Sequence, residues 1–131
     1  YGYNNRSAML RLPQSRFCIE NRAADMCMNP YLALGMTAAA MTEGVVNRYA
    51  AGAPLNQDLY EMNEEAIKSS GAQRLPRNLL EAIEILRSNE LARTVFGETM
   101  MQSYLRYKMD EWERYHQAVT DWEVEEYLRL Y

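Results

Sequence analysis

The first 22 residues have the residue spacing of strands, whereas the rest of the chain has the spacing of helices. Residues 7–12 and 16–22 are short runs of mixed polarity, and Pro13-Gln14-Ser15 between them is a turn sequence. In the second run Phe17 and Ile19 alternate with charged side chains, as in a strand, where side chains repeat every two residues. The pattern predicts a β-hairpin with one apolar face and one charged face.

From Asn29 onward the apolar positions follow a helical period. A helix is expected over residues 30–48, after an N-cap asparagine and a proline suited to the first helical position, and its residues 31–41 are apolar almost all round. A helix without a polar face is normally buried on every side, and that is the prediction here. A short helix is expected at Glu64–Ser69. Asn78 and Glu81 have the spacing of a capping box at the start of the next helix.

The C-terminal part of the chain predicts further helices. A new helix begins near Ser88-Asn89, Gly97 interrupts its pattern, and residues 98–119 form a long amphipathic helix. Thr120-Asp121-Trp122-Glu123 is a capping box that opens a last short helix ending near Tyr131. The predicted fold class is α+β but mainly α, with a short N-terminal β-hairpin followed by a helical bundle.

Composition and charge narrow the class of protein. The chain has 131 residues, 48% of them hydrophobic, and a net charge of −4, which suits one folded domain and argues against a general nucleic-acid binder. No run approaches about 18 uninterrupted apolar residues, so no membrane span is predicted. The sequence opens at Tyr1 without the pattern of a signal peptide, and we expect it to be cut from a longer protein.

The two cysteines do not predict a metal site. Cys18 and Cys27 are nine positions apart, and the single histidine, His116, is far along the chain, whereas structural zinc needs about four nitrogen or sulfur ligands. We expect free, mostly buried thiols in a cytoplasmic protein.

The one unusual cluster of charge lies in the predicted hairpin. Residues 1–22 carry a local charge of +3, from one glutamate and four arginines: Arg6, Arg11, Arg16, Glu20 and Arg22. A guanidinium is a planar fork that matches phosphate and carboxylate oxygens and does not lose its proton. The cluster is therefore a candidate site for a polyanion such as a nucleotide phosphate. A solvated charged face with a weak arginine–glutamate pair is the alternative.

Side-chain alternation sorts the members of this cluster. Arg11 and Arg16 flank the turn and come near each other at the hairpin tip, and Glu20 and Arg22 share a face. Arg6 and Arg11 fall on opposite faces by simple alternation, so Arg6 must precede the strand or lie beside a bulge to join the others.

At these residues the sequence resembles the C-terminal part of the glutamine synthetase catalytic domain. The family pattern is N-R-S-A-x-x-R-[IL]-P, then R-x-E-x-R, an aspartate and N-P-Y-L. Within the family it resembles the type III-like, or gamma-glutamylmethylamide synthetase, subgroup. The resemblance covers essentially the whole chain, and its motifs are Asn5–Ala8, Arg11–Pro13, Glu20–Arg22, Asp25, Asn29–Leu32, Asp58–Tyr60, Leu75–Arg77, Ala82, Trp112 and Val119–Glu123.

The resemblance implies a role for each charged residue. Arg6 matches an arginine that contacts both the substrate glutamate and the transferring phosphate, and Arg11 matches one that holds ATP phosphates. Glu20 matches a ligand of the metal ion, Mg²⁺ or Mn²⁺, that bridges the nucleotide phosphates. Arg22 matches the arginine that binds the glutamate substrate. Cys18 stands where the family often has arginine, and Arg16 is expected to offer that ATP-contacting charge from two residues earlier.

The resemblance also implies an activity, which is ATP-dependent synthesis of glutamine or a gamma-glutamyl amide through gamma-glutamyl phosphate. The substrates are L-glutamate and either ammonia or a small amine, with methylamine, a polyamine or an aromatic amine left open. Family members are cytoplasmic and assemble as stacked rings, so we expect a homo-oligomer without nucleic-acid or membrane partners.

The predicted parts of the chain are residues 1–28, a strand pair with the active-site arginines, and residues 29–131, the helical part. One carboxylate does not make a magnesium site, which needs about six oxygen ligands, so the isolated chain is expected to be inactive. The competing interpretation is a non-catalytic helical module that packs on other subunits through residues 98–119 and the Trp122–Tyr131 tail.

Overall fold

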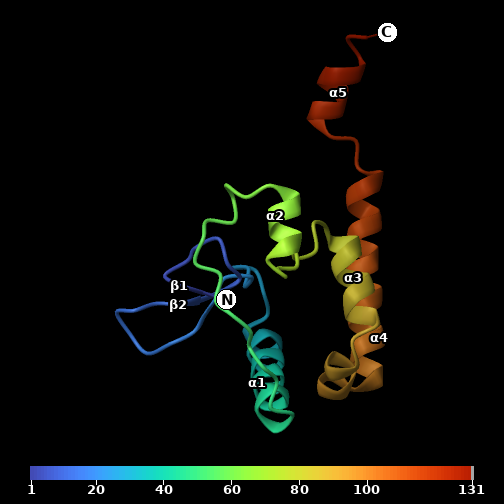
Figure 1. Ribbon diagram of the computed structural model, residues 1–131. Coiled ribbons are helices and arrows are strands. Elements are labelled where there is room, and N and C mark those ends of the chain that lie inside the picture. Colours follow the sequence, from blue (N-terminus) through green and yellow to red (C-terminus); the bar gives the residue numbers. More distant parts are fainter. Residues whose placement is uncertain (131) are drawn as a thin grey trace. The chain divides into compact units, whose positions relative to one another are not determined.

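The computed structural model describes residues 1–130, and the predicted end of the last helix at Tyr131 lies outside them. The chain divides into two units, Tyr1–Leu75 and Pro76–Tyr131, and each is described by itself. The first unit contains β1 (Gly2–Tyr3), β2 (Leu10–Leu12), β3 (Glu20–Asn21), α1 (Pro30–Val46) and α2 (Glu64–Ser69) (Figure 1). The second contains α3 (Leu79–Arg87), α4 (Glu90–Gln117) and α5 (Asp121–Tyr127).

The N-terminal sheet has three short strands in the order β1-β2-β3. Strand β2 pairs antiparallel with β3, which confirms the predicted strand pair, and parallel with β1, which the sequence pattern did not reveal because β1 has only two residues. The predicted fold class, mainly helical with a short N-terminal sheet, is confirmed.

The paired part of the hairpin is shorter than the alternating pattern suggested. Phe17 and Ile19 lie outside the strands and are exposed, so the prediction that they form one face of a strand is wrong. The connection between β2 and β3 is a run of turns and bends that begins after Pro13, and its backbone is not held in register by a neighbouring strand. Alternation of side chains therefore does not continue through it.

Helix α1 begins as its sequence predicts, but it is not buried. The Asn29 side chain accepts hydrogen bonds from the amides of Tyr31 and Leu32, and Pro30 takes the first position. None of its residues is buried, and Leu34 and Val45 are 68% and 78% exposed. An apolar helix becomes buried only where another segment packs against it. No other described helix or strand of the first unit packs against α1.

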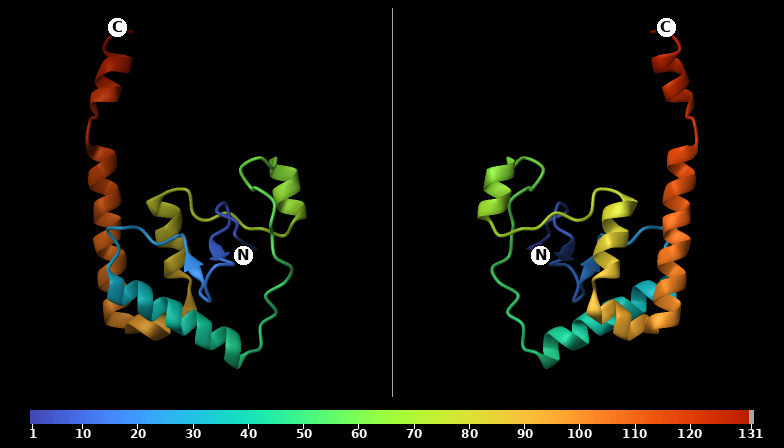
Figure 2. Two further views of the ribbon diagram at one scale, coloured as in Figure 1. Left: turned by 90° about the vertical axis from the view of Figure 1, so that its left-hand side faces the viewer. Right: turned by 90° about the vertical axis from the view of Figure 1, so that its right-hand side faces the viewer.

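The second unit has a small apolar core between α3 and α4. Ile83 of α3 and Ala92, Met101 and Leu105 of α4 are buried. Gly97 interrupts α4 with φ 70° and ψ 158°, as the pattern predicted, and Figure 2 shows the short first part of α4 turning sharply into its long second part. This backbone conformation is open almost only to glycine.

Asparagine and threonine N-caps set the helix starts of the second unit. Asn78 caps α3 by accepting from the Glu81 amide, but the Glu81 carboxylate accepts from the amide of Arg77 instead of closing the predicted box on Asn78. The box between Thr120 and Glu123 at α5 is complete, as predicted. No helix among the described residues combines the length and the apolar character that crossing a membrane requires.

Candidate active site

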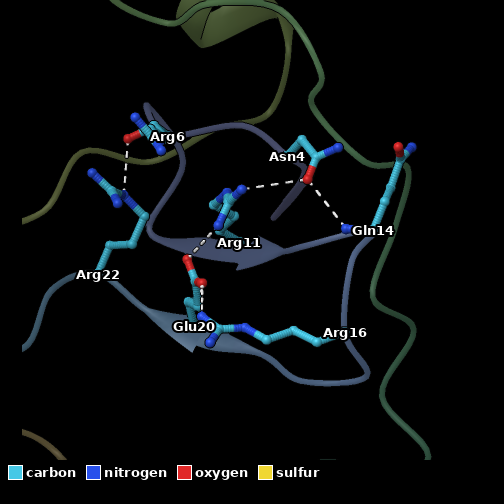
Figure 3. Close-up of polar contacts among 7 residues, drawn as sticks. All are labelled: Asn4, Arg6, Arg11, Gln14, Arg16, Glu20 and Arg22. Atoms are coloured by element: carbon cyan, nitrogen blue, oxygen red, sulfur yellow. Dashed lines mark hydrogen bonds and ion pairs between the residues drawn. The ribbon is translucent and has the colours of Figure 1, made fainter.

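Strand pairing brings Arg11, Glu20 and Arg16 into one ion cluster. The register places Arg11 of β2 directly opposite Glu20 of β3. The Glu20 carboxylate accepts from Arg11 Nη1 at 2.8 Å through one oxygen and from Arg16 Nη2 at 2.5 Å through the other (Figure 3). The Arg11 side chain is 18% exposed and that of Arg16 65% exposed, so Arg11 is the fixed partner and Arg16 the one with room to move.

The ion pairs shift the pKa of Glu20 and of Arg16 in the direction that favours their charged forms. Hydrogen bonds from Arg11 and then Arg16 lower the pKa of Glu20 below its ordinary value. The hydrogen bond to Glu20, together with the nearby Cys18 thiol, raises the pKa of Arg16. Both shifts have the sign expected when a carboxylate and a guanidinium stabilise each other's charged forms.

Cys18 and Cys27 are both exposed, so the prediction of buried thiols is wrong.

Arg6 and Arg22 form a second group beside the first. Arg6 lies in the loop between β1 and β2, as simple alternation required of it, and its carbonyl accepts a hydrogen bond from Arg22 Nε at 2.9 Å. The Arg22 amide also donates to the Met9 carbonyl at 2.9 Å, which continues the pairing of β2 and β3. Figure 3 shows the Arg6 and Arg22 side chains next to each other, to the left of the Arg11–Glu20 pair.

The two groups of arginines differ in how many of their guanidinium N–H donors lack a hydrogen-bond partner. Within the described residues, the Arg6 guanidinium makes no hydrogen bond or ion pair, and Arg22 uses only its Nε. The Nε of Arg11 is a buried nitrogen without a hydrogen-bond partner. An unpaired buried donor costs free energy, and a cluster of free guanidinium donors is suited to oxygen-rich anions. The arrangement fits a phosphate or carboxylate ligand.

A divalent cation fits these residues less well. Both Glu20 oxygens are engaged by arginines, and the described residues bring together no group of three histidine, cysteine, aspartate or glutamate side chains. Since magnesium takes about six oxygen ligands, Glu20 alone is one ligand at most.

Two asparagines organise the loop before β2: Asn4, which the sequence pattern did not single out, and Asn5, which was noted only as the first residue of the N-R-S-A motif. Asn4 has φ 52°, and its Oδ1 accepts from the Gln14 amide at 3.1 Å and from Arg11 Nη2 at 3.4 Å (Figure 3). Asn5 is buried and bonds to a segment about fifty residues further on. The usable signal was the Asn4-Asn5 pair itself, because asparagine tolerates positive φ and bonds to nearby backbone.

Comparisons with known proteins agree with this architecture. The family described as "Glutamine synthetase, catalytic domain" matches residues 1–127. Glutamate–methylamine ligase of Methyloversatilis universalis is 40% identical over 131 residues, 100% of this chain and 29% of that protein. Glutamine synthetase of Staphylococcus aureus is 35% identical over 130 residues, 97% of this chain and 29% of that protein. A structure of a GmaS/ADP complex superimposes with a TM-score of 0.83 at 32% identity, over 98% of this chain and 29% of that one.

These matches define a class of protein, a catalytic domain of the glutamine synthetase type, and the family follows directly. The chain belongs to the glutamine synthetase family, and the resemblance drawn from its motifs is confirmed. It spans 29% of the length of these relatives. The roles of Arg6, Arg11, Arg16, Glu20 and Arg22 are not tested by the matches and stay predictions.

Proposed function

We propose that this chain is the C-terminal part of the catalytic domain of an ATP-dependent ligase that joins L-glutamate to ammonia or a small amine. The observation that carries the proposal is the gathering of four arginines around β2 and β3, with free guanidinium donors on Arg6 and Arg22. Family membership and the ligase names of the relatives support it.

The proposed reaction has two steps. A γ-carboxylate oxygen of glutamate attacks the γ-phosphorus of ATP, the bond to the bridging oxygen breaks, and ADP leaves. The amine then attacks the γ-glutamyl carbon, phosphate departs with the former carboxylate oxygen, and the nitrogen gives up a proton. Both steps concentrate negative charge on phosphoryl oxygens. Fixed guanidinium groups stabilise such charge without having to reorganise.

Each arginine has a proposed place in this chemistry. Arg6 and Arg22 contact the substrate carboxylate and the transferring phosphoryl group, because their donors are free and their loops are tied together. Arg11 and Arg16 contact ATP phosphates. Arg16 is largely exposed, so it is able to leave Glu20 when a nucleotide offers better acceptors.

Glu20 is proposed as one ligand of the Mg²⁺ or Mn²⁺ that accompanies ATP. The remaining ligands have to come from other parts of the enzyme, because the described residues bring together no group of three histidine, cysteine, aspartate or glutamate side chains. For the same reason we propose that the isolated chain is inactive. Membership of the glutamine synthetase family supports the further proposal that the complete enzyme is a cytoplasmic homo-oligomer.

A substrate panel tests the proposed function. The complete enzyme is supplied with ATP, Mg²⁺ and L-glutamate, together with ammonia, methylamine, a polyamine or an aromatic amine, and the γ-glutamyl product and phosphate are measured. We expect equal amounts of product and phosphate with ammonia or methylamine, and no phosphate release by the isolated 131-residue chain. Absence of any γ-glutamyl product from the complete enzyme would refute the proposal.

A further inference from the structure

The loop that carries Arg6 is attached to a segment far away in the sequence, Leu55–Leu59, called here the strap. Asn5 Nδ2 donates to the carbonyls of Leu55 at 2.7 Å and of Gln57 at 2.9 Å, and the Leu59 amide donates to Ser7 Oγ at 2.9 Å. The strap is therefore hydrogen-bonded to the residues on both sides of Arg6, which are Asn5 and Ser7.

The Asn5 side chain uses all of its hydrogen-bonding capacity. Its two N–H donors serve the strap, and its Oδ1 accepts from the Ser7 amide at 2.9 Å and from Ser7 Oγ at 2.6 Å. Asn5 is 9% exposed and is a buried polar residue of the described chain. A saturated, buried amide has one favourable orientation, since any other leaves donors or acceptors unpaired at about 1–3 kcal/mol each.

The same contact requires glycine at position 2. A Cβ placed on Gly2 would lie 2.2 Å from the Leu55 carbonyl oxygen and 2.6 Å from Asn5 Cβ. The chain thus approaches the strap too closely for any side chain at this position. Such close approach is a usual reason for glycine within a strand.

Arg6 is therefore fixed from three directions while its own side chain stays free. Asn5 and Ser7 hold its backbone on either side, and Arg22 Nε holds its carbonyl at 2.9 Å. We propose that Asn5 and Ser7, held by the backbone groups of Leu55, Gln57 and Leu59, are positioning residues for the Arg6 guanidinium, an inference that rests on the proposed function of Arg6. These three backbone groups belong to the active-site scaffold although they lie about fifty residues from Arg6 in the sequence.

The alternative is that these bonds only stabilise the fold. The strap offers a matched control, because Asn56 Oδ1 accepts from the Tyr3 amide at 2.9 Å and links the same two segments without touching the Arg6 loop. A purely structural role predicts that losing either contact has the same kind of effect. A positioning role predicts that only the contacts next to Arg6 affect turnover.

The experiment compares Ser7→Ala, Asn5→Asp and Asn56→Ala in the complete enzyme, by kcat, KM for glutamate and thermal midpoint. We expect Ser7→Ala to lower kcat about 10- to 100-fold, the loss typical of a small misplacement of a reacting group, and Asn5→Asp to lower it at least as much. Asn56→Ala should lower the thermal midpoint and leave kcat unchanged. If Asn5→Asp does not fold, Ser7→Ala decides. Wild-type kcat in Ser7→Ala, or an equal kcat loss in Asn56→Ala, overturns the inference.

Arg6→Ala separates this inference from the proposed function. If Arg6→Ala loses synthesis while Ser7→Ala retains full kcat, the active-site assignment of Arg6 stands and the positioning role is wrong. If Arg6→Ala retains full synthesis, the assignment of Arg6 itself is wrong, and the positioning role is overturned with it.

Discussion

The two units of the chain are held together by different forces. In the first unit, hydrogen bonds join segments that are far apart in the sequence, such as those from Asn5 to the strap. In the second unit, α3 and α4 pack through buried apolar side chains, with Ile83 and Met101 the largest of them. All five charged residues of the candidate site lie in the first unit, Tyr1–Leu75.

The difference matches what each unit has to do. Apolar packing stabilises strongly but is non-directional, and it tolerates side chains of similar volume. Hydrogen bonds contribute less net free energy, yet each one fixes an angle and a distance. A cluster of arginines that is proposed to contact a phosphoryl group needs fixed directions. We therefore expect substitutions in the second unit to change stability most, and those in the first to change activity most.

The largest stability effect is expected at Met101, whose side chain is 0% exposed. Met101→Ala should destabilise the second unit by about 2–5 kcal/mol, because it leaves a cavity between α3 and α4. Hydrogen exchange of the α3 and α4 amides measures the effect. The neighbouring Met100, 42% exposed, is the control, and Met100→Ala should cost less than about 0.5 kcal/mol. Equal protection in the two variants would show that apolar packing does not hold this unit.

A smaller effect is expected at the interruption of α4. Gly97→Ala should cost about 1–3 kcal/mol, because φ 70° with ψ 158° is strained for any residue with a side chain. The control is Gly44→Ala in α1, where a Cβ meets nothing within 4 Å and helix propensity favours alanine by about 0.5–1 kcal/mol. Urea unfolding curves should therefore shift in opposite directions, and a stabilising Gly97→Ala would mean that α4 is continuous.

The smallest effect is a pH dependence in the first unit. The pKa of Glu20 is lowered from 4.5 in the folded chain, so the stabilisation from its arginine bonds is complete above the unfolded value and is lost as pH falls through the folded one. Acid titration of the wild type against Glu20→Gln should show this loss only in the wild type, by hydrogen exchange of the β2 and β3 amides. Identical acid profiles would mean that the pairs form no net favourable contact.

Local signals in the sequence predicted the helices well. The starts of α1 and α5, the bounds of α2 and the break at Gly97 all depend on one to four neighbouring residues, and all are confirmed. The burial of α1 and the strand over Phe17 and Ile19 were wrong, because both depend on a covering or pairing segment that local patterns do not specify. Strand β1 was missed because its two residues are too few to show a pattern.

The residues of the candidate site were likewise predicted only in part from the sequence. Its five charged residues were identified from composition and motifs, and the register of β2 and β3 pairs Arg11 with Glu20. The strap was not identified, because a hydrogen bond between Asn5 and a carbonyl fifty residues away leaves no periodic trace in the sequence. The hydrogen bonds that fix the loop carrying Arg6 therefore come from Asn5, Ser7 and the strap, whose positions follow no repeating pattern.

The central claim is that the free arginines of the first unit act on the transferring phosphoryl group. The most direct measurement is ATP-dependent synthesis by the complete enzyme carrying Arg22→Ala, beside Arg74→Ala as the control. Arg74 is an exposed arginine of the same unit, and among the described residues its one ion pair is with Glu64 at 3.7 Å. We predict that Arg22→Ala lowers kcat by about 100-fold or more while Arg74→Ala turns over normally. Near-normal turnover in Arg22→Ala would contradict the account.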